Sequence, residues 1–139
     1  MDVTLVEHAN GMATVLRQGT GIAIISPQQG RILLKLAALD RRIRRDMLPA
    51  LLGFNLSDVA YLRSLTEEEL FAVLRRPFPG ERKPLTAAQR ASLSRSVRRL
   101  REYRLIQKGG AELALDPCGH MVGDYLLANI QRHGSFLRG

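Results

Sequence analysis

The sequence predicts a mainly helical α+β fold, and three observations support this. Four short polar residues, each followed by apolar residues at three- and four-residue steps, mark the starts of helices. Two glycine-containing turns, Asn10-Gly11 and Gly109-Gly110, are each flanked by short apolar runs that suit β-hairpins. With 139 residues, of which 45% are hydrophobic, the chain is long enough for one core that needs no disulfide or metal.

Residues 1–26 allow two interpretations. Apolar runs over Val3–Ala9 and Met12–Arg17 flank Asn10-Gly11, the dipeptide most typical of a two-residue β-hairpin, and a third apolar run follows. A β-hairpin extended into a small meander is the first interpretation, and an amphipathic arm broken at the glycine is the second. On either interpretation, this segment is an N-terminal extension to a domain predicted over residues 27–139.

Two helices are predicted in the first half of that domain. Ser26 begins a capping box, in which this residue and a glutamine or glutamate three positions later bond the free N–H groups of a helix start. The apolar stripe that follows predicts a helix over Pro27–Arg45. We attribute the arginine cluster at its end to the negative pole of the helix dipole, in preference to a second anion site. Thr66 begins a second capping box and a helix that the following prolines terminate, and Ser57 or Asp58 could cap a short helix between the two.

The helix with the most distinctive surface is predicted over residues 86–104. Thr86 and Gln89 form its capping box, and successive side chains are separated by about 100° around a helix axis. Its narrow apolar stripe consists of Leu93, Val97 and Leu100. Because most of the arginines fall on the opposite side, we expect one buried face and one basic outward face.

The formal net charge of +8 is concentrated around this helix. Residues 82–108 contain nine basic side chains and one acidic side chain, and the rest of the chain is balanced, with twelve of each. Such a concentration predicts a polyanionic partner. A solvated face that only keeps the protein soluble is the alternative.

A short β-hairpin and a last helix complete the predicted domain. Leu105–Lys108 and Ala111–Leu115 flank the two glycines at 109 and 110, which tolerate the positive φ angles of a tight turn. Asp116 supplies an acidic helix cap, and Pro117 is the first helical residue, where its missing N–H costs nothing. We expect this helix to extend to about His133.

Residues 85–127 resemble the winged-helix half of MarR-type bacterial transcriptional regulators. The segment Leu93–Leu100, followed by Leu105-Ile106, is similar to that family's recognition helix and its exit into the wing. The sequence Leu-Asp-Pro-Cys-Gly at 115–119 resembles the family's Leu-Thr-Pro-x-Gly turn into the last helix, and residues 26–76 resemble the start of the domain more weakly. The resemblance implies a winged helix-turn-helix with a short β-hairpin wing.

Three features depart from that family. Arg104 stands where family members usually have a glycine before the Leu-Ile pair. The connection from Arg75 to Thr86 is longer than the tight turn of a standard helix-turn-helix. The terminal segments do not reproduce the family's long dimerisation helices. From the family we therefore carry over to this chain the expectation of a DNA-contacting helix, and little else.

The candidate site residues follow from this resemblance and from side-chain chemistry. Arginine in the major groove can bond guanine with two N–H groups or bind phosphate oxygens, and helices in that groove contact bases mainly with their first half. We assign base-edge contacts to Gln89, Ser92, Ser94 and Arg95. We assign contacts with the phosphate backbone to Lys83, Arg90, Arg98, Arg99 and Lys108.

The predicted function is that of a sequence-specific transcriptional regulator that binds double-stranded DNA. A homodimer is expected, because paired half-sites multiply affinity and specificity. The alternative is an architectural nucleic-acid-binding protein without sequence preference, or a winged-helix adaptor that docks on another protein. A strong preference for one DNA sequence would distinguish these functions. The sequence identifies no effector molecule.

Enzymatic chemistry is not predicted, and neither a cofactor nor a metal is expected. His8, His120 and His133 are scattered along the chain, and Cys118 is the only cysteine. Cys118 stands at a predicted helix start, where the dipole could stabilise a thiolate, but the neighbouring Pro117 and Gly119 already explain this segment as a turn, which we favour. The sequence has no signal-peptide pattern and no apolar run of membrane-span length, so we expect a cytoplasmic protein without a membrane partner.

Overall fold

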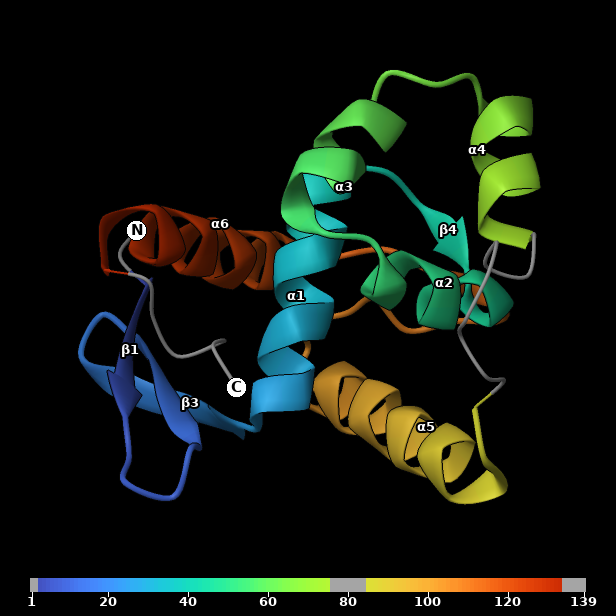
Figure 1. Cartoon of the computed structure of the whole chain (residues 1–139). Helices are drawn as coiled ribbons and strands as arrows, with labels where there is room; N and C mark the ends of the chain where they lie inside the picture. The colour runs from blue at the N-terminus through green and yellow to red at the C-terminus, as the bar shows by residue number, and fades with distance from the viewer. Residues whose placement is uncertain (1–2, 76–84, 134–139) are drawn as a thin grey trace.

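The computed structural model describes residues 3–75 and 85–133 and confirms a mainly helical α+β fold (Figure 1). Helix α1 runs through the middle of the molecule, where α6 crosses it, and α5 lies near its N-terminal end (Figure 1). In chain order the elements are β1 (Val3–Glu7), β2 (Ala13–Arg17), β3 (Thr20–Ile25), α1 (Pro27–Leu39), β4 (Ile43–Arg44), the 3-10 helix η1 (Arg45–Met47), α2 (Leu48–Gly53), α3 (Leu56–Leu62), α4 (Glu67–Arg75), α5 (Ala87–Glu102), β5 (Glu112–Leu113) and α6 (Pro117–His133).

The N-terminal segment forms the predicted meander, an antiparallel sheet in the order β1-β2-β3. Gly11 takes a φ of +85° in the first turn, as the Asn-Gly signal indicates. The alternative of an amphipathic arm is therefore wrong. Ala13, Val15 and Ile25 are fully buried in the same core as α1 and α6, so the sheet shares the hydrophobic core of the helices.

Helix α1 begins as predicted and ends earlier than predicted. The Ser26 Oγ accepts a bond from the Gln29 N–H at 3.1 Å, and the Gln29 Oε1 accepts one from the Ser26 N–H at 2.8 Å. The prediction that the helix extends to Arg45 is wrong, because Asp40 takes a left-handed conformation (φ 53°) and Ile43 is buried from a strand. The arginines at 41–45 therefore do not lie in the last turn of α1, and the dipole does not explain them.

Two short helices follow β4 and η1, and only one of them has a counterpart in the sequence prediction. Pro49 lies in the first turn of α2, and Gly53 is its last residue. Proline is compatible with a first turn because its N–H would have no partner there. Helix α3 is capped by Asn55, whose Oδ1 accepts a bond from the Asp58 N–H at 2.9 Å, and not by Ser57 or Asp58.

Helix α4 confirms the second capping box. The Glu69 N–H donates to the Thr66 Oγ1 at 3.1 Å, and the Thr66 N–H donates to the Glu69 Oε1 at 3.0 Å. The predicted end of this helix at the prolines, the charged loop and the candidate phosphate contact Lys83 lie at 76–84, outside the described residues.

Helix α5 has the predicted capping box and ends two residues before the predicted Arg104. The Gln89 N–H donates to the Thr86 Oγ1 at 3.1 Å, and the Thr86 N–H donates to the Gln89 Oε1 at 2.9 Å. Arg104 then takes a φ of +61°, in the left-handed region that disfavours a side chain with a Cβ. This conformation gives a physical reason why glycine would suit the position.

Arg104→Gly is therefore expected to stabilise the fold, whereas Arg104→Ala is not. Alanine removes the same charge and retains the Cβ, so the glycine variant should exceed the alanine variant by about 1 kcal/mol in free energy of unfolding. Urea unfolding of both variants and the parent measures this difference. A glycine variant no more stable than the alanine variant would show that Arg104 is unstrained.

The hairpin after α5 forms only in part. Gly109 and Gly110 take positive φ angles of +131° and +33°, as predicted. The arm over Leu105–Lys108 forms no regular strand, and a single bridge pairs Ile106 with Leu115. The other arm pairs as β5 with β4, with Leu113 opposite Ile43. The prediction of a two-stranded hairpin is wrong in this respect, because the ladder partner comes from a distant segment. We call residues 106–115 the wing segment.

Helix α6 has the predicted bounds and packs closely against α1. The Asp116 Oδ1 accepts a bond from the Cys118 N–H at 3.3 Å. A Cβ at Gly123 would lie 2.4 Å from the Cβ of Ala37, so this glycine permits the crossing of α1 and α6. Val122 and Leu126 are buried in the core of the chain itself, so neither is available for a dimer surface on this helix.

His120 links α6 to the end of α1. Its Nε2 lies 2.9 Å from the Asp40 Oδ1, and its Nδ1 lies 3.0 Å from the Asp124 Oδ2. Arg63 of the α3 end lies 3.4 Å from the other oxygen of Asp40. The hydrogen bond to Asp40, and after it that to Asp124, raises the pKa of His120 above its ordinary value of 6.5, although partial burial opposes this.

The raised pKa predicts a pH-dependent contribution to stability. Protonated His120 is favoured by folding, so its contribution is full below about pH 6.5 and is lost as pH rises through the higher folded pKa. Because the side chain is 39% exposed, solvent screening limits the effect to below about 1 kcal/mol. The loss of stability caused by His120→Gln should be larger at about pH 5.5 than at about pH 8.5, measured by urea unfolding. An equal loss at both pH values would contradict this assignment.

Candidate nucleic-acid interface

Helix α5 presents one face to the core and the opposite face to solvent, as its sequence predicts. Leu93, Val97 and Leu100 are at most 8% exposed. Ser96 is also buried, and its hydroxyl lies 2.6 Å from the Oε1 of Gln28 in the first turn of α1. This packing fixes the rotation of α5 about its axis and directs its arginines outward.

The structure separates the four predicted base contacts into two groups. Ser94 and Arg95 are consecutive residues, and both are exposed on the outward face. Their side chains have no polar partner within the described residues. Ser92 is half-buried and turned toward Gln28, with its hydroxyl 3.4 Å from the Gln28 Oε1. Gln89 is exposed, but its side-chain oxygen already accepts a bond from the Thr86 N–H in the helix cap. The geometry therefore leaves Ser94 and Arg95 the freest to contact a ligand.

The predicted phosphate contacts differ in the same way. Arg98 and Lys108 are exposed, and neither side chain has a partner in the part of the chain that the structure describes. Arg90 donates to the carbonyl oxygen of Leu85 at 2.7 Å, which ties it to the helix start. Arg99 lies 3.4 Å from Glu102, and its guanidinium stands 5.5 Å from the ring centroid of Tyr103. These last two arginines would have to exchange local contacts for phosphate oxygens.

Sequence reasoning missed Arg101 as a structural part of the site. Its Nη2 donates to the carbonyl oxygens of Gly109 (3.2 Å), Gly110 (3.4 Å) and Glu112 (3.0 Å). This single side chain therefore fixes the wing segment against α5. No sequence signal distinguishes it from the other arginines of the helix, because its partners are backbone atoms.

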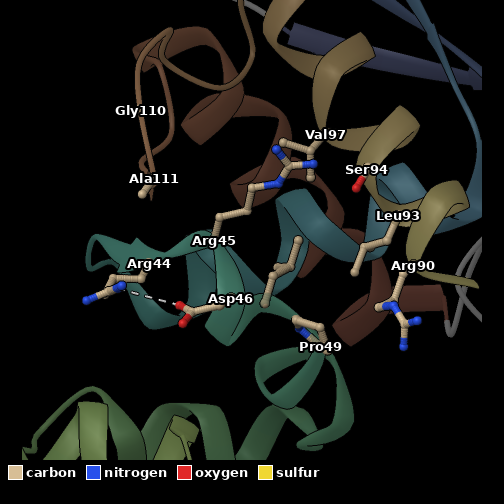
Figure 2. A pocket seen from close by; sticks show the side chains of 11 residues that line it. Arg44, Arg45, Asp46, Pro49, Arg90, Leu93, Ser94, Val97, Gly110 and Ala111 are labelled. Atoms are coloured by element: carbon tan, nitrogen blue, oxygen red, sulfur yellow. Dashed lines mark ion pairs between the residues drawn. The ribbon is translucent and has the colours of Figure 1, made fainter. Parts of the chain in front are cut away.

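Sequence reasoning also missed the arginines of β4 and η1. Arg44 lies 3.6 Å from Asp46, whereas the Arg45 side chain extends toward Val97 of α5 (Figure 2). The main chain of Arg45 is held in place by the wing segment, since its N–H donates to the carbonyl oxygen of Ala111 at 2.6 Å. The run of arginines at 41–45 was the available signal, and we attributed it to the helix dipole.

A groove of about 600 Å³ lies between these elements (Figure 2). We call it the η1–α5 groove. Its floor is apolar and three arginines stand around it, with one carboxylate, that of Asp46. The residues that line it are Arg44, Arg45, Asp46, Leu48, Pro49, Arg90, Leu93, Ser94, Val97, Gly110 and Ala111. The outward face of α5 therefore adjoins a basic surface contributed by β4, η1 and the wing segment.

Other chemistry finds little support in the described residues. Burial raises the pKa of the Cys118 thiol, so the helix start does not make this cysteine a stabilised thiolate. His120 is engaged by two carboxylates. Among the side chains that the structure describes, no group of three or more His, Cys, Asp or Glu could hold a metal ion. No described helix is long and apolar enough to cross a membrane.

In comparisons with known proteins, no family profile matches the chain, and no match was found among curated proteins or solved structures.

Proposed function

We propose that the protein binds double-stranded DNA through α5 and acts as a sequence-specific transcriptional regulator. The observation that carries the proposal is the outward face of this helix. Ser94, Arg95 and Arg98 are exposed there without polar partners among the described residues, while Ser96 and the apolar stripe are turned inward. Side chains that already hydrogen-bond to one another would have to break those bonds to contact DNA. These three have no such bonds to break within the described part of the chain.

The dimensions and chemistry of this face suit the major groove of B-DNA. That groove is about 12 Å wide and admits an α-helix. Arg95 could bond the O6 and N7 atoms of guanine, and the Ser94 hydroxyl could donate to or accept from a base edge. Arg98, with Lys108 on the wing segment, would bind backbone phosphates on either side.

The order of elements also supports the proposal. Strand β4 follows α1 in the chain and pairs with β5 of the wing segment. Helices α2 and α5 lie between β4 and the wing segment in chain order, and α3 and α4 separate these two helices. Without residues 55–85, this is the order of elements in a winged helix-turn-helix, with α5 as the recognition helix. The left-handed conformation of Arg104 adds a second point of agreement, since the MarR-type proteins that the sequence resembles usually have glycine there.

We further propose that the protein acts on DNA as a homodimer. One helix of this length contacts only a few base pairs, and a second copy would double the contacts with a two-fold symmetric site. The N-terminal sheet offers one surface for dimer formation, since Val6 and Ile24 on it are 47% and 51% exposed.

A second candidate function is architectural binding without sequence preference. The number of arginines around the η1–α5 groove favours it, because phosphate contacts alone carry no sequence information. The two functions share duplex binding and differ in base contacts, so a separate measurement has to discriminate between them.

Duplex binding itself is tested by fluorescence anisotropy with three probes of equal charge. These probes are a random-sequence duplex, a single strand and polyglutamate. The proposal predicts tightest binding to the duplex and a steep loss of affinity with salt, since each phosphate contact contributes about −0.9 to the slope of log K against log salt concentration. Equal binding of polyglutamate and duplex would contradict a DNA-specific surface.

A further inference from the structure

A smaller cavity, of about 260 Å³, lies between η1 and α5 beside the groove of Figure 2. We call it the arginine cavity. Four arginines from two separate segments line it, and none of its described lining residues is acidic. The lining residues are Arg45, Ser94, Arg95, Val97, Arg98 and Arg101.

Four like charges around one small space repel one another, so the chain must hold them there by other interactions. Arg45 is placed by the main-chain bond from its N–H to Ala111. Arg101 is placed by the three wing-segment carbonyls that its Nη2 contacts. Arg95 and Arg98 are placed by the rotation of α5, which the buried stripe fixes.

Two of these arginines are free to bind an anion. The side chains of Arg45 and Arg98 are exposed and have no polar partner within the described residues. Arg101 differs, because its Nη2 is held by the wing-segment carbonyls and its Nε is buried without a partner among the described residues. One compact anion with several acceptor oxygens would accept bonds from Arg45 and Arg98 together and reduce the repulsion between the like charges.

We propose that the arginine cavity binds a phosphate group. Arginine matches the oxygens of a phosphate with two parallel N–H bonds, and Arg45 and Arg98 can supply such bonds from two separate segments. Ser94 and Arg95 then stay available for the base edge, as the proposed function requires. A phosphate also offsets the repulsion between the arginines, whereas a carboxylate has only two oxygens and one charge and would leave more of the donors unpaired.

Under the proposed function, on which this step rests, the group is a backbone phosphate of the DNA duplex. The strand would then pass between η1 and α5, which sets the position of the recognition helix along the groove. Arg45 becomes a positioning residue of the interface, although it lies far from α5 in the sequence. Arg44 lines the η1–α5 groove but not this cavity, and it lies 3.6 Å from Asp46, so Arg44→Gln removes a charge from the same basic surface without removing a cavity residue.

The test compares Arg45→Gln with Arg44→Gln and Arg45→Lys. All three change exposed side chains, and urea unfolding checks that each variant folds. Duplex affinity is measured over a range of salt concentrations. Arg45→Gln should lower the affinity about tenfold and reduce the salt slope by about 0.9, whereas Arg44→Gln should change the affinity less than about threefold. Arg45→Lys should fall between the two, because it retains the charge and loses the planar fork.

A second arm distinguishes a duplex phosphate from a free one, with inorganic pyrophosphate titrated calorimetrically. Pyrophosphate binding that Arg45→Gln abolishes, without duplex binding by the parent protein, would retain the phosphate site and overturn the proposed function. Duplex binding that Arg45→Gln and Arg44→Gln weaken equally would overturn the phosphate site and leave the proposed function standing. If the parent protein binds neither probe, both are overturned.

Discussion

Gly119→Ala is expected to prevent stable folding, which is the largest effect that we predict for a single methyl group. An ideal Cβ at this position would lie 1.8 Å from the carbonyl oxygen of Leu105 and 2.7 Å from its carbonyl carbon. That oxygen cannot easily move, because it accepts a bond from the Asp116 N–H at 3.1 Å and Leu105 is fully buried. We expect a loss above about 3 kcal/mol in free energy of unfolding.

Circular dichroism during urea unfolding measures this loss, and Gly21→Ala is the matched control. A Cβ at Gly21 would meet only side-chain atoms at 3.6 Å and 3.8 Å, which is ordinary contact. The control should change stability by less than about 1 kcal/mol. A Gly119→Ala protein as stable as the control would mean that α6 does not pack against the Leu105 carbonyl group as described.

Arg95→Ala is expected to weaken binding to the preferred DNA sequence by roughly 1–3 kcal/mol, which is about 5- to 150-fold. The effect on random duplex DNA should be much smaller, because a base contact carries sequence information and a phosphate contact does not. Stability should remain unchanged, since Arg95 is exposed and has no polar partner among the described residues. Anisotropy titrations with the preferred and the random duplex give both values.

Lys108→Ala provides the opposite pattern and Arg75→Ala the control. Lys108 is exposed on the wing segment, and its removal should weaken both duplexes alike. Arg75 ends α4, away from α5, and its removal should leave both affinities unchanged. If Arg95→Ala and Lys108→Ala produced equal losses on both duplexes, the division between base and phosphate contacts would be wrong.

Local chemistry in the sequence was sufficient to predict the starts of most helices. The three capping boxes at Ser26, Thr66 and Thr86 each form both of their reciprocal hydrogen bonds. A cap depends on residues within one turn, so the information lies in a four-residue window. The same applies to the turns at Gly11 and at Gly109-Gly110, whose positive φ angles follow from their residue types.

The features that the sequence did not predict depend on contacts between distant segments. The end of α1 is set by Ile43, which enters the core from a strand whose partner, Leu113, lies 70 positions further along the chain. Ile43 also fits the helical spacing of the apolar residues before it, so the pattern alone does not mark the end of the helix. Helix α2 was missed because Pro49 disfavours a helix interior and is compatible with a first turn, and the two positions look alike without the fold.

The candidate site shows the same limit. The concentration of charge and the apolar stripe were enough to predict which face of α5 is basic. They could not show that Ser92 is turned toward Gln28, or that the side-chain oxygen of Gln89 accepts a bond from the Thr86 N–H. They also could not place Arg45 beside Arg98, since this juxtaposition arises from the pairing of β4 with the wing segment.

The most direct test of the proposed function is selection from a pool of random duplex DNA by the purified protein, at two salt concentrations. Base contacts persist as salt rises, whereas phosphate contacts weaken steeply. We predict that one motif is enriched at both concentrations, in the form of an inverted repeat if the protein is a dimer. Retention at low salt without enrichment would contradict sequence-specific regulation and favour the architectural function, and no retention at low salt would contradict DNA binding altogether.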